Sequence, residues 1–169
     1  MAFFTRCSAI ALSALLSACA GSGAAPVRAD IIAAELDADH RALELQLHLV
    51  ASPVLAEALA NGVPLVFEFR LRPANGAVRR QALRLQYLPL SGRYQLQQDG
   101  HPDQQFGSQL QLFAALDRVR LEFDQPLATS GWVSFALDRR TLPAALRLPA
   151  LLDRGWWVVS ERVHWQARS

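Results

Sequence analysis

The chain has 169 residues, with 17 basic and 15 acidic side chains and a formal net charge of +2. This length predicts one domain with a single hydrophobic core, and the near balance of charge leaves little field for binding nucleic acid. Both cysteines, Cys7 and Cys19, lie near the N-terminus, so the rest of the chain has no thiol for disulfides, thiolate zinc sites or cysteine catalysis.

An apolar run that ends at a cysteine opens the chain. Arg6 precedes the apolar residues 9–16, and residues 16–19 read LSAC. The run is about half of the roughly 20 residues that a transmembrane helix needs, so we expect a cleaved signal peptide. The LSAC pattern resembles the lipobox of bacterial lipoproteins, which implies a diacylglyceryl group on Cys19. Cleavage by an ordinary signal peptidase, without lipidation, is the alternative.

Three segments follow from this signal. We expect a signal peptide over residues 1–18, a flexible tether over residues 19–26 and a single β-rich domain over residues 27–169. Ala20 stands where lipoproteins kept in the inner membrane often carry Asp. The resemblance therefore implies an outer-membrane lipoprotein that faces the periplasm, with a soluble periplasmic protein as the alternative.

Period-2 alternation predicts strands through most of the domain. Leucines occupy every second position from 43 to 49, with polar residues between them. We expect an α+β, mainly β fold, as an antiparallel sandwich or curled sheet of about eight strands with two short covering helices. The strands are expected near residues 30–36, 43–49, 65–71, 83–87, 93–97, 121–123, 133–137 and 156–165. The residues expected to be nearly inaccessible are Leu45, Leu47, Phe67, Phe69, Leu85, Phe135 and Trp157.

Two serines mark the expected helix starts. Ser52 precedes Pro53, a good first helical residue, and Gly62 ends that helix. Ser108 precedes a second apolar stripe that packs on the sheet. A long connection that contains Pro143 and Pro149 is expected to lead to the last strand.

The last strand offers the best functional lead. Continuous alternation places Trp157 and Trp165 on the core face, and Trp156 and Arg162 on the other face. An exposed tryptophan beside an arginine is typical of interfaces with proteins or lipid headgroups, so we interpret Trp156 and Arg162 as partner-binding residues. A covered second sheet face is the alternative. Glu161 falls on the core face, so either an arginine meets it or a β-bulge turns it outward.

The order of the elements carries a resemblance. The segments ALANGVPL (58–65) and RYQL (93–96), Phe106, and the Leu-Asp, Leu-Pro and Trp landmarks from 137 to 156 resemble successive landmarks of one family. It is the exported proteobacterial domain-of-unknown-function family DUF4390. The resemblance covers nearly the whole mature chain and brings no known activity. It implies a signal peptide and an association with envelope signalling.

Patterns for catalysis and metal binding are weak. The four histidines, at positions 40, 48, 101 and 164, have no spacing that pairs two of them as ligands, and a site assembled from distant strands is the alternative. The acid pairs at 37/39 and 122/124 are interpreted as solvated surface acids. The arginine doublets at 79–80 and 139–140 are interpreted as solvated turn or edge residues, with a patch for an acidic partner as the alternative. We expect no enzyme, no cofactor and no metal.

The leading functional hypothesis is a non-catalytic, lipid-anchored envelope protein that acts as a protein-interaction module. Its expected partners are the membrane, through the lipid on Cys19, and an unidentified envelope protein. The alternative is a carrier or chaperone that encloses a lipid or acyl chain inside the curled sheet. A large apolar cavity would distinguish the two, because a packed interior leaves no room for such a ligand.

Overall fold

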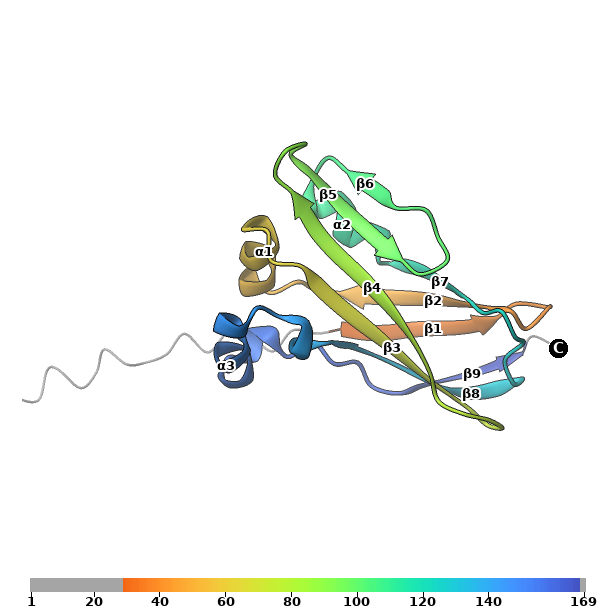
Figure 1. Cartoon of the computed structure of the whole chain (residues 1–169). Helices are drawn as coiled ribbons and strands as arrows, with labels where there is room; N and C mark the ends of the chain where they lie inside the picture. Colours follow the sequence, from red (N-terminus) through yellow and green to blue (C-terminus); the bar gives the residue numbers. More distant parts are fainter. Residues whose placement is uncertain (1–28, 168–169) are drawn as a thin grey trace, which may run out of the picture.

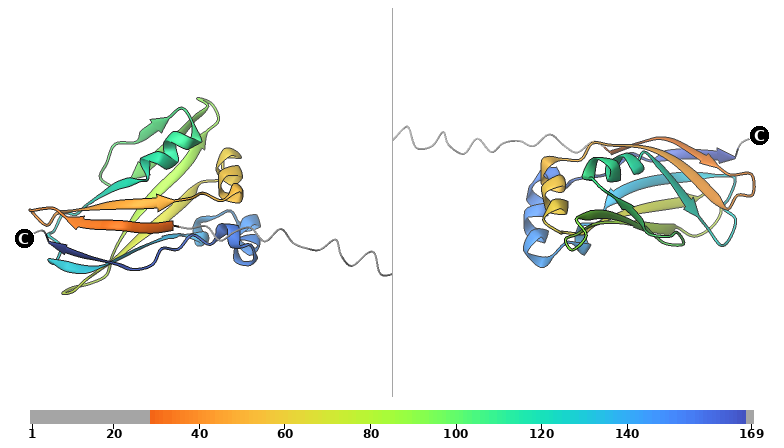
Figure 2. Two further views of the ribbon diagram at one scale, coloured as in Figure 1. Left: turned by 180° about the vertical axis from the view of Figure 1, so that it is seen from behind. Right: turned by 90° about the horizontal axis from the view of Figure 1, so that it is seen from above.

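Nine strands hydrogen-bond into one curled sheet (Figure 1). The computed structural model describes residues 29–167, and within them the strand order is β6-β5-β4-β3-β8-β9-β1-β2-β7. Figure 2 shows the sheet rolled into an open half-barrel. The predicted mainly β fold is confirmed, as a curled sheet. The strands are β1 (Ala29–Leu36), β2 (Ala42–Leu49), β3 (Leu65–Pro73), β4 (Arg79–Leu88), β5 (Arg93–Gln98), β6 (Gln104–Phe106), β7 (Arg118–Glu122), β8 (Ser130–Leu137) and β9 (Val163–Ala167).

Antiparallel pairing dominates, as predicted. β1 and β9 are the exception, because Glu35 and Leu36 pair in parallel with Gln166 and Ala167. The short strand β6 was not predicted and accounts for the ninth strand. The predicted signal peptide, the tether and Cys19 lie outside the described residues.

The inner face of the half-barrel holds the core. Phe135 of β8 stacks on Phe67 of β3, with ring centroids 5.0 Å apart, and lies 4.8 Å from the ring of Phe69. These contacts follow from the alternation of apolar residues along both strands. The predicted burial is confirmed for Leu45, Leu47, Phe67, Phe69, Leu85 and Phe135.

Side chains rather than a ladder join β7, at one edge of the sheet, to β4 and β5 across the curl. The amide groups of Gln81 in β4 and Gln98 in β5 donate to the carbonyl oxygens of Glu122 and Arg120 in β7. Arg79 donates to the carbonyl oxygen of Gln125 at 2.8 Å. These bonds satisfy edge groups that would otherwise be open to pairing with another chain.

Three α-helices accompany the sheet: α1 (Pro53–Ala60), α2 (Gln109–Ala115) and α3 (Ala144–Leu152). The first two begin as predicted, because the hydroxyl groups of Ser52 and Ser108 accept hydrogen bonds from the third residue after each. α3 was not predicted, since Pro149 lies inside it and proline ordinarily interrupts a helix. Two 3₁₀ turns, η1 (Arg139–Thr141) and η2 (Arg154–Trp156), flank α3. Within residues 29–167, no helix has the length and apolarity to cross a bilayer.

The last strand is shorter than predicted and is preceded by a β-bulge. Upstream of β9, a single antiparallel bridge joins Ala136 to Val159, whereas Val133 faces Val163. Three steps along β8 therefore correspond to four steps along the final segment. The extra residue between positions 159 and 163 defines the bulge.

The bulge reverses which side chains face the core upstream of it. Trp156 is 4% exposed, whereas Trp157 is 49% exposed. The predicted exposure of Trp156 and burial of Trp157 are therefore wrong, while Trp165, downstream of the bulge, is buried as predicted. Glu161 is exposed, in agreement with the bulge alternative.

Candidate functional site

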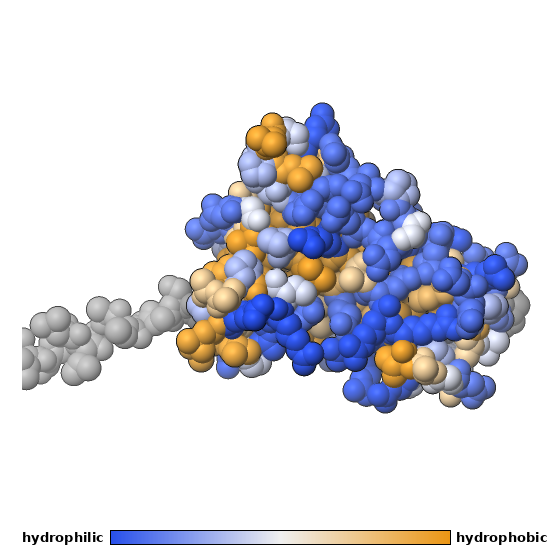
Figure 3. Space-filling view, viewed as in Figure 1, coloured by the Kyte–Doolittle hydropathy of each residue, from blue (hydrophilic) through white to orange (hydrophobic). Residues whose placement is uncertain are grey.

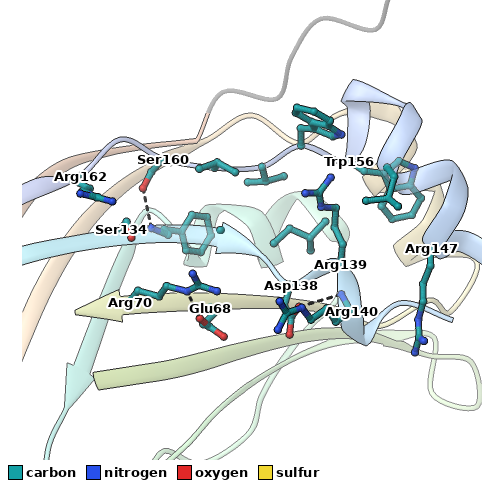
Figure 4. Close-up of a pocket in the computed structure, with 17 residues that line it drawn as sticks. Glu68, Arg70, Ser134, Asp138, Arg139, Arg140, Arg147, Trp156, Ser160 and Arg162 are labelled. Atoms are coloured by element: carbon teal, nitrogen blue, oxygen red, sulfur yellow. Dashed lines mark hydrogen bonds and ion pairs between the residues drawn. The ribbon is translucent and has the colours of Figure 1, made fainter. Parts of the chain in front are cut away.

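A groove of about 620 Å³ lies on the outer face of β3 and β8 (Figure 4). The segment 156–162 and helix α3 form its other walls. β3 contributes the outward-facing Glu68 and Arg70 to its lining, and β8 contributes Ser134 together with the apolar residues 135–137. Five arginines line it, against two carboxylates: Arg70, Arg139, Arg140, Arg147 and Arg162, with Glu68 and Asp138.

Both carboxylates are already engaged. Glu68 forms ion pairs with Arg70 and with Arg80. Asp138 caps η1, because its Oδ1 accepts a hydrogen bond of 3.0 Å from the backbone N–H of Arg140. Neither acid forms an ion pair with the other four arginines of the groove.

Four guanidinium groups at the groove have no acidic partner within residues 29–167. No carboxylate of the described residues lies within ion-pairing distance of Arg139, Arg140, Arg147 or Arg162. Backbone carbonyls hold two of them in place: Arg139 donates to the carbonyl of Ala150 at 3.3 Å, and Arg147 donates to that of Leu142 at 2.9 Å. The groove therefore presents positive charge, and two of its four unpaired guanidinium groups are held in place.

Tryptophan side chains mark both ends of this surface. The guanidinium of Arg139 lies 5.2 Å from the ring centroid of Trp157, within cation–π range. A second groove of about 390 Å³ shares Arg70 and Arg162 with the first and extends it toward Arg72 and the exposed Trp132. We call the two hollows together the arginine groove. An even mixture of charge along the sequence thus becomes a local excess of positive charge in the fold.

The two predicted partner-binding residues differ in exposure. Arg162 is exposed and lines the arginine groove. Trp156 contributes to the groove wall, but its side chain belongs to the core, so its predicted role as an exposed anchor loses its basis. Trp157 was predicted to be buried and is instead exposed. The doublet Arg139–Arg140 was interpreted as solvated turn or edge residues, although, like Arg162, it lines the groove.

A model of a domain of unknown function, DUF4390, matches residues 24–166. The chain belongs to the DUF4390 family. The match spans every described element except the end of β9. Searches of curated proteins and of solved structures gave no match to the chain. The family assignment thus confirms the resemblance and leaves the function to be argued from the groove.

Acidic residues of the DUF4390 domain that were candidates for chemistry instead form ion pairs with Arg120. Arg120 binds the carboxylates of Glu44 (2.7 Å), Asp37 (2.9 Å) and Glu122 (3.2 Å). Hydrogen bonds to Glu122, Asp37 and Glu44 outweigh desolvation and hold the pKa of Arg120 above its usual range. These acids therefore serve an ion-pair cluster that links β7 to β2. No group of three or more His, Cys, Asp or Glu side chains within residues 29–167 is arranged to hold a metal ion.

The other arginine doublet of the DUF4390 domain, Arg79–Arg80, makes contacts within the sheet and its loops. Arg79 lies 5.7 Å from the ring centroid of Phe123 and donates to the backbone at Gln125. Arg80 pairs with Glu68 at 3.8 Å. Arg80 thus has an acidic partner, and of the two doublets the one at 139–140 is the one that lines the groove.

Ser160 holds the bulge beside the groove. Its hydroxyl accepts a hydrogen bond from the N–H of Phe135 (2.8 Å) and donates one to the carbonyl of Glu161 (2.9 Å). In Ser160→Ala the buried Phe135 N–H loses its partner, so the free energy of unfolding should fall by about 1–3 kcal/mol. Urea denaturation measures the change, with Ser134→Ala on the outer face as a control expected within about 0.5 kcal/mol of the wild type. Equal stability of the two variants would contradict this role.

Proposed function

We propose that this chain is a non-catalytic, lipid-anchored protein of the cell envelope, and that its arginine groove binds an acidic, extended segment of another envelope protein. The observation that carries the proposal is the set of four arginines around one groove that have no acidic partner among the described residues. Positive charge that is not paired with a carboxylate has an electrostatic preference for an anionic ligand.

Arginine suits carboxylates better than lysine does. Its planar guanidinium donates two parallel hydrogen bonds to one carboxylate and stacks on aromatic rings. Trp132 at one end of the groove supplies such a ring, and tryptophan and arginine are among the residues most enriched at the energetic centres of protein interfaces. An extended acidic peptide would meet both kinds of side chain along the groove.

The carrier hypothesis lacks a comparable supporting observation. The inner face of the half-barrel is filled by large side chains, among them Phe67, Phe69, Phe135 and Trp165. The arginine groove lies on the outer face and has a mixed polar and apolar lining. An acyl chain would require an open cavity with an apolar lining inside the half-barrel.

An acidic peptide tests the groove directly. The intact protein should bind a glutamate-rich decapeptide, and binding should weaken as salt is added. The double variant Arg140→Gln/Arg162→Gln should bind at least about tenfold more weakly, because each charge-assisted hydrogen bond contributes about 1.5–3 kcal/mol. The matched control is Arg93→Gln/Arg118→Gln, which removes two exposed arginines from β5 and β7.

The control should bind as the wild type does. Equal losses in the two double variants would indicate a general charge effect and contradict the groove. In cells, a photo-crosslinking residue at position 140 should capture a protein partner, and the same residue at position 93 should not. A partner whose crosslinked segment carries no acidic residues would contradict the proposed chemistry.

Lipidation is expected at Cys19. Mass spectrometry of the mature N-terminus should detect a diacylglyceryl-modified cysteine, and Cys19→Ala should move the protein from the membrane fraction to the soluble fraction. Each buried CH₂ of an acyl chain contributes about 0.8 kcal/mol to membrane attachment, so several chains on one cysteine hold the protein firmly. An unmodified N-terminus downstream of Cys19 would contradict this prediction.

A further inference from the structure

Helix α3 has an apolar surface on two sides. Leu146 and Ala150 pack toward the core. Leu148, Leu151 and Leu152, at i, i+3 and i+4 spacing, form a second stripe on the opposite side, with exposed fractions of 66%, 54% and 78%. A surface helix ordinarily keeps polar residues on its solvent side, so this outer stripe lacks a covering partner among the described residues.

The stripe is part of a larger amphipathic surface. Trp157 and Val159 are exposed beside it, and Trp157 lines the groove together with Leu151 and Arg147 of α3. Arg154 is exposed in η2, directly after the helix. Figure 3 shows orange apolar groups at the α3 end of the molecule, next to strongly hydrophilic ones. We call this surface, made of α3, Arg154, Trp157 and Val159, the α3 face.

The α3 face lies at the end of the domain where the described chain begins. Ala29, the first residue of β1, pairs with Leu49 at the end of β2. β2 leads to Ser52, whose hydroxyl donates a 2.7 Å hydrogen bond to the carbonyl of Gly155 in η2. The start of β1, α1 and η2 are thus together at one end, and Figure 1 places α3 there as well.

The predicted lipid attachment site is close to this end along the chain. Ala29 lies ten positions after Cys19, and ten residue steps span at most about 33–36 Å. A domain held by Cys19 therefore keeps its α3 end near the bilayer surface.

We propose that the α3 face docks on the anionic surface of a lipid bilayer. Trp157 and the three leucines of the outer stripe enter the interfacial layer, and Arg147 and Arg154 contact phosphate headgroups. The inference rests on the proposed tethering of the chain through Cys19. It leaves the part of the arginine groove between Arg70, Arg140 and Arg162 open for a protein partner.

The composition of the α3 face favours a lipid surface over a second copy of the chain. Tryptophan and leucine beside arginine are the residues that bind in the interfacial layer, where the ring sits at headgroup level and the guanidinium reaches phosphate. A symmetric dimer through this face would bring the arginines of both copies together, at a cost in like-charge repulsion. Among the acids nearby, Asp153 is already used to cap η2 through the N–H of Gly155 (2.8 Å).

Fluorescence quenching by brominated lipids tests the docking in the intact chain. The protein is reconstituted in vesicles of phosphatidylglycerol and phosphatidylcholine with bromine on the acyl chains, and tryptophan emission is compared with that in unbrominated vesicles. Trp157 and Trp132 form a matched pair, because they are 49% and 48% exposed at opposite ends of the arginine groove. Trp157→Phe should lose most of the quenching, whereas Trp132→Phe should keep it. Equal effects of the two substitutions, or no quenching at all, would overturn the proposal.

Two further arms separate the outcomes. Arg147→Gln/Arg154→Gln should reduce the quenching to the level found in vesicles of phosphatidylcholine alone. Quenching that is unchanged both by this double substitution and by removal of phosphatidylglycerol would overturn the role of the anionic headgroups. Cys19→Ala distinguishes docking from tethering. If quenching of Trp157 persists in Cys19→Ala, the result supports docking even if the tether fails. If the wild-type chain binds to the vesicles but Trp157 is not quenched, the docking proposal is overturned and the tether is not. A dimer that Leu151→Glu dissolves would assign the face to a second copy and overturn the proposal.

Discussion

Gly131→Ala is expected to destabilise the domain by about 3 kcal/mol or more, at the upper end of the usual cost of overpacking. A Cβ at this position would lie 2.4 and 2.5 Å from two ring carbons of Trp165 and 2.6 Å from the carbonyl oxygen of Arg72. The ring of Trp165 is fully buried and donates a 3.2 Å hydrogen bond to the carbonyl of Ala128. Neither the ring nor the strand backbone can move aside without losing contacts.

The measurement is chemical unfolding of Gly131→Ala beside a glycine control. In Gly107→Ala the new Cβ would meet only Gln111 Oε1, at 3.5 Å, which is an ordinary contact. This control should stay within about 0.5 kcal/mol of the wild type. Because domains of this kind are stable by only about 5–15 kcal/mol, the effect at Gly131 should be plain in the denaturation midpoint. If the two variants unfold alike, the close packing at Gly131 is wrong.

The strands of the fold follow from local pattern. Alternation predicts the buried faces of β2, β3 and β8 because each residue in a regular strand turns to the opposite side from its neighbour. The helix starts at Ser52 and Ser108 are also local, since a serine hydroxyl caps the N–H groups of the next turn. Both kinds of signal lie within a few residues, so one sequence is enough to find them.

The last segment was predicted wrongly for a physical reason. A bulge adds one residue and so shifts the alternation for everything on its far side. The exposed acid Glu161 in an apolar row was a local sign of it, and a bulge was one of the two explanations offered for that acid. Its consequence for Trp156 and Trp157 depends on pairing with β8, which the sequence does not display.

The arginine groove could not be predicted from the sequence for a similar reason. Arg70 comes from β3, Arg139 and Arg140 from η1, Arg147 from α3 and Arg162 from the bulged segment. Only the strand order, which places β3, β8 and the final segment side by side, gathers them on one face. The net charge of +2 gave no sign of this local excess of arginine, because acidic residues elsewhere, such as those around Arg120, balance the total charge.

Trp156→Ala is expected to lower the free energy of unfolding by about 3–5 kcal/mol, the range for deleting a large aromatic side chain from a core. Trp156 is almost fully buried and is the last residue of the capped turn η2, which Ser52 ties to α1. Trp157→Ala should cost less than about 1 kcal/mol, because its half-exposed ring loses chiefly the cation–π contact with Arg139.

Chemical unfolding of the two variants under identical conditions decides between the bulged and the continuous strand. The bulge places Trp156 inside and Trp157 outside, so the midpoint of Trp156→Ala alone should shift strongly. A continuous strand would give the opposite order, since Trp157 would then share the face of the buried Trp165. The proposed role of Trp157 on the α3 face requires that it be the tolerated position. A large loss of stability in Trp157→Ala would therefore contradict the bulge and remove the exposed tryptophan from the α3 face.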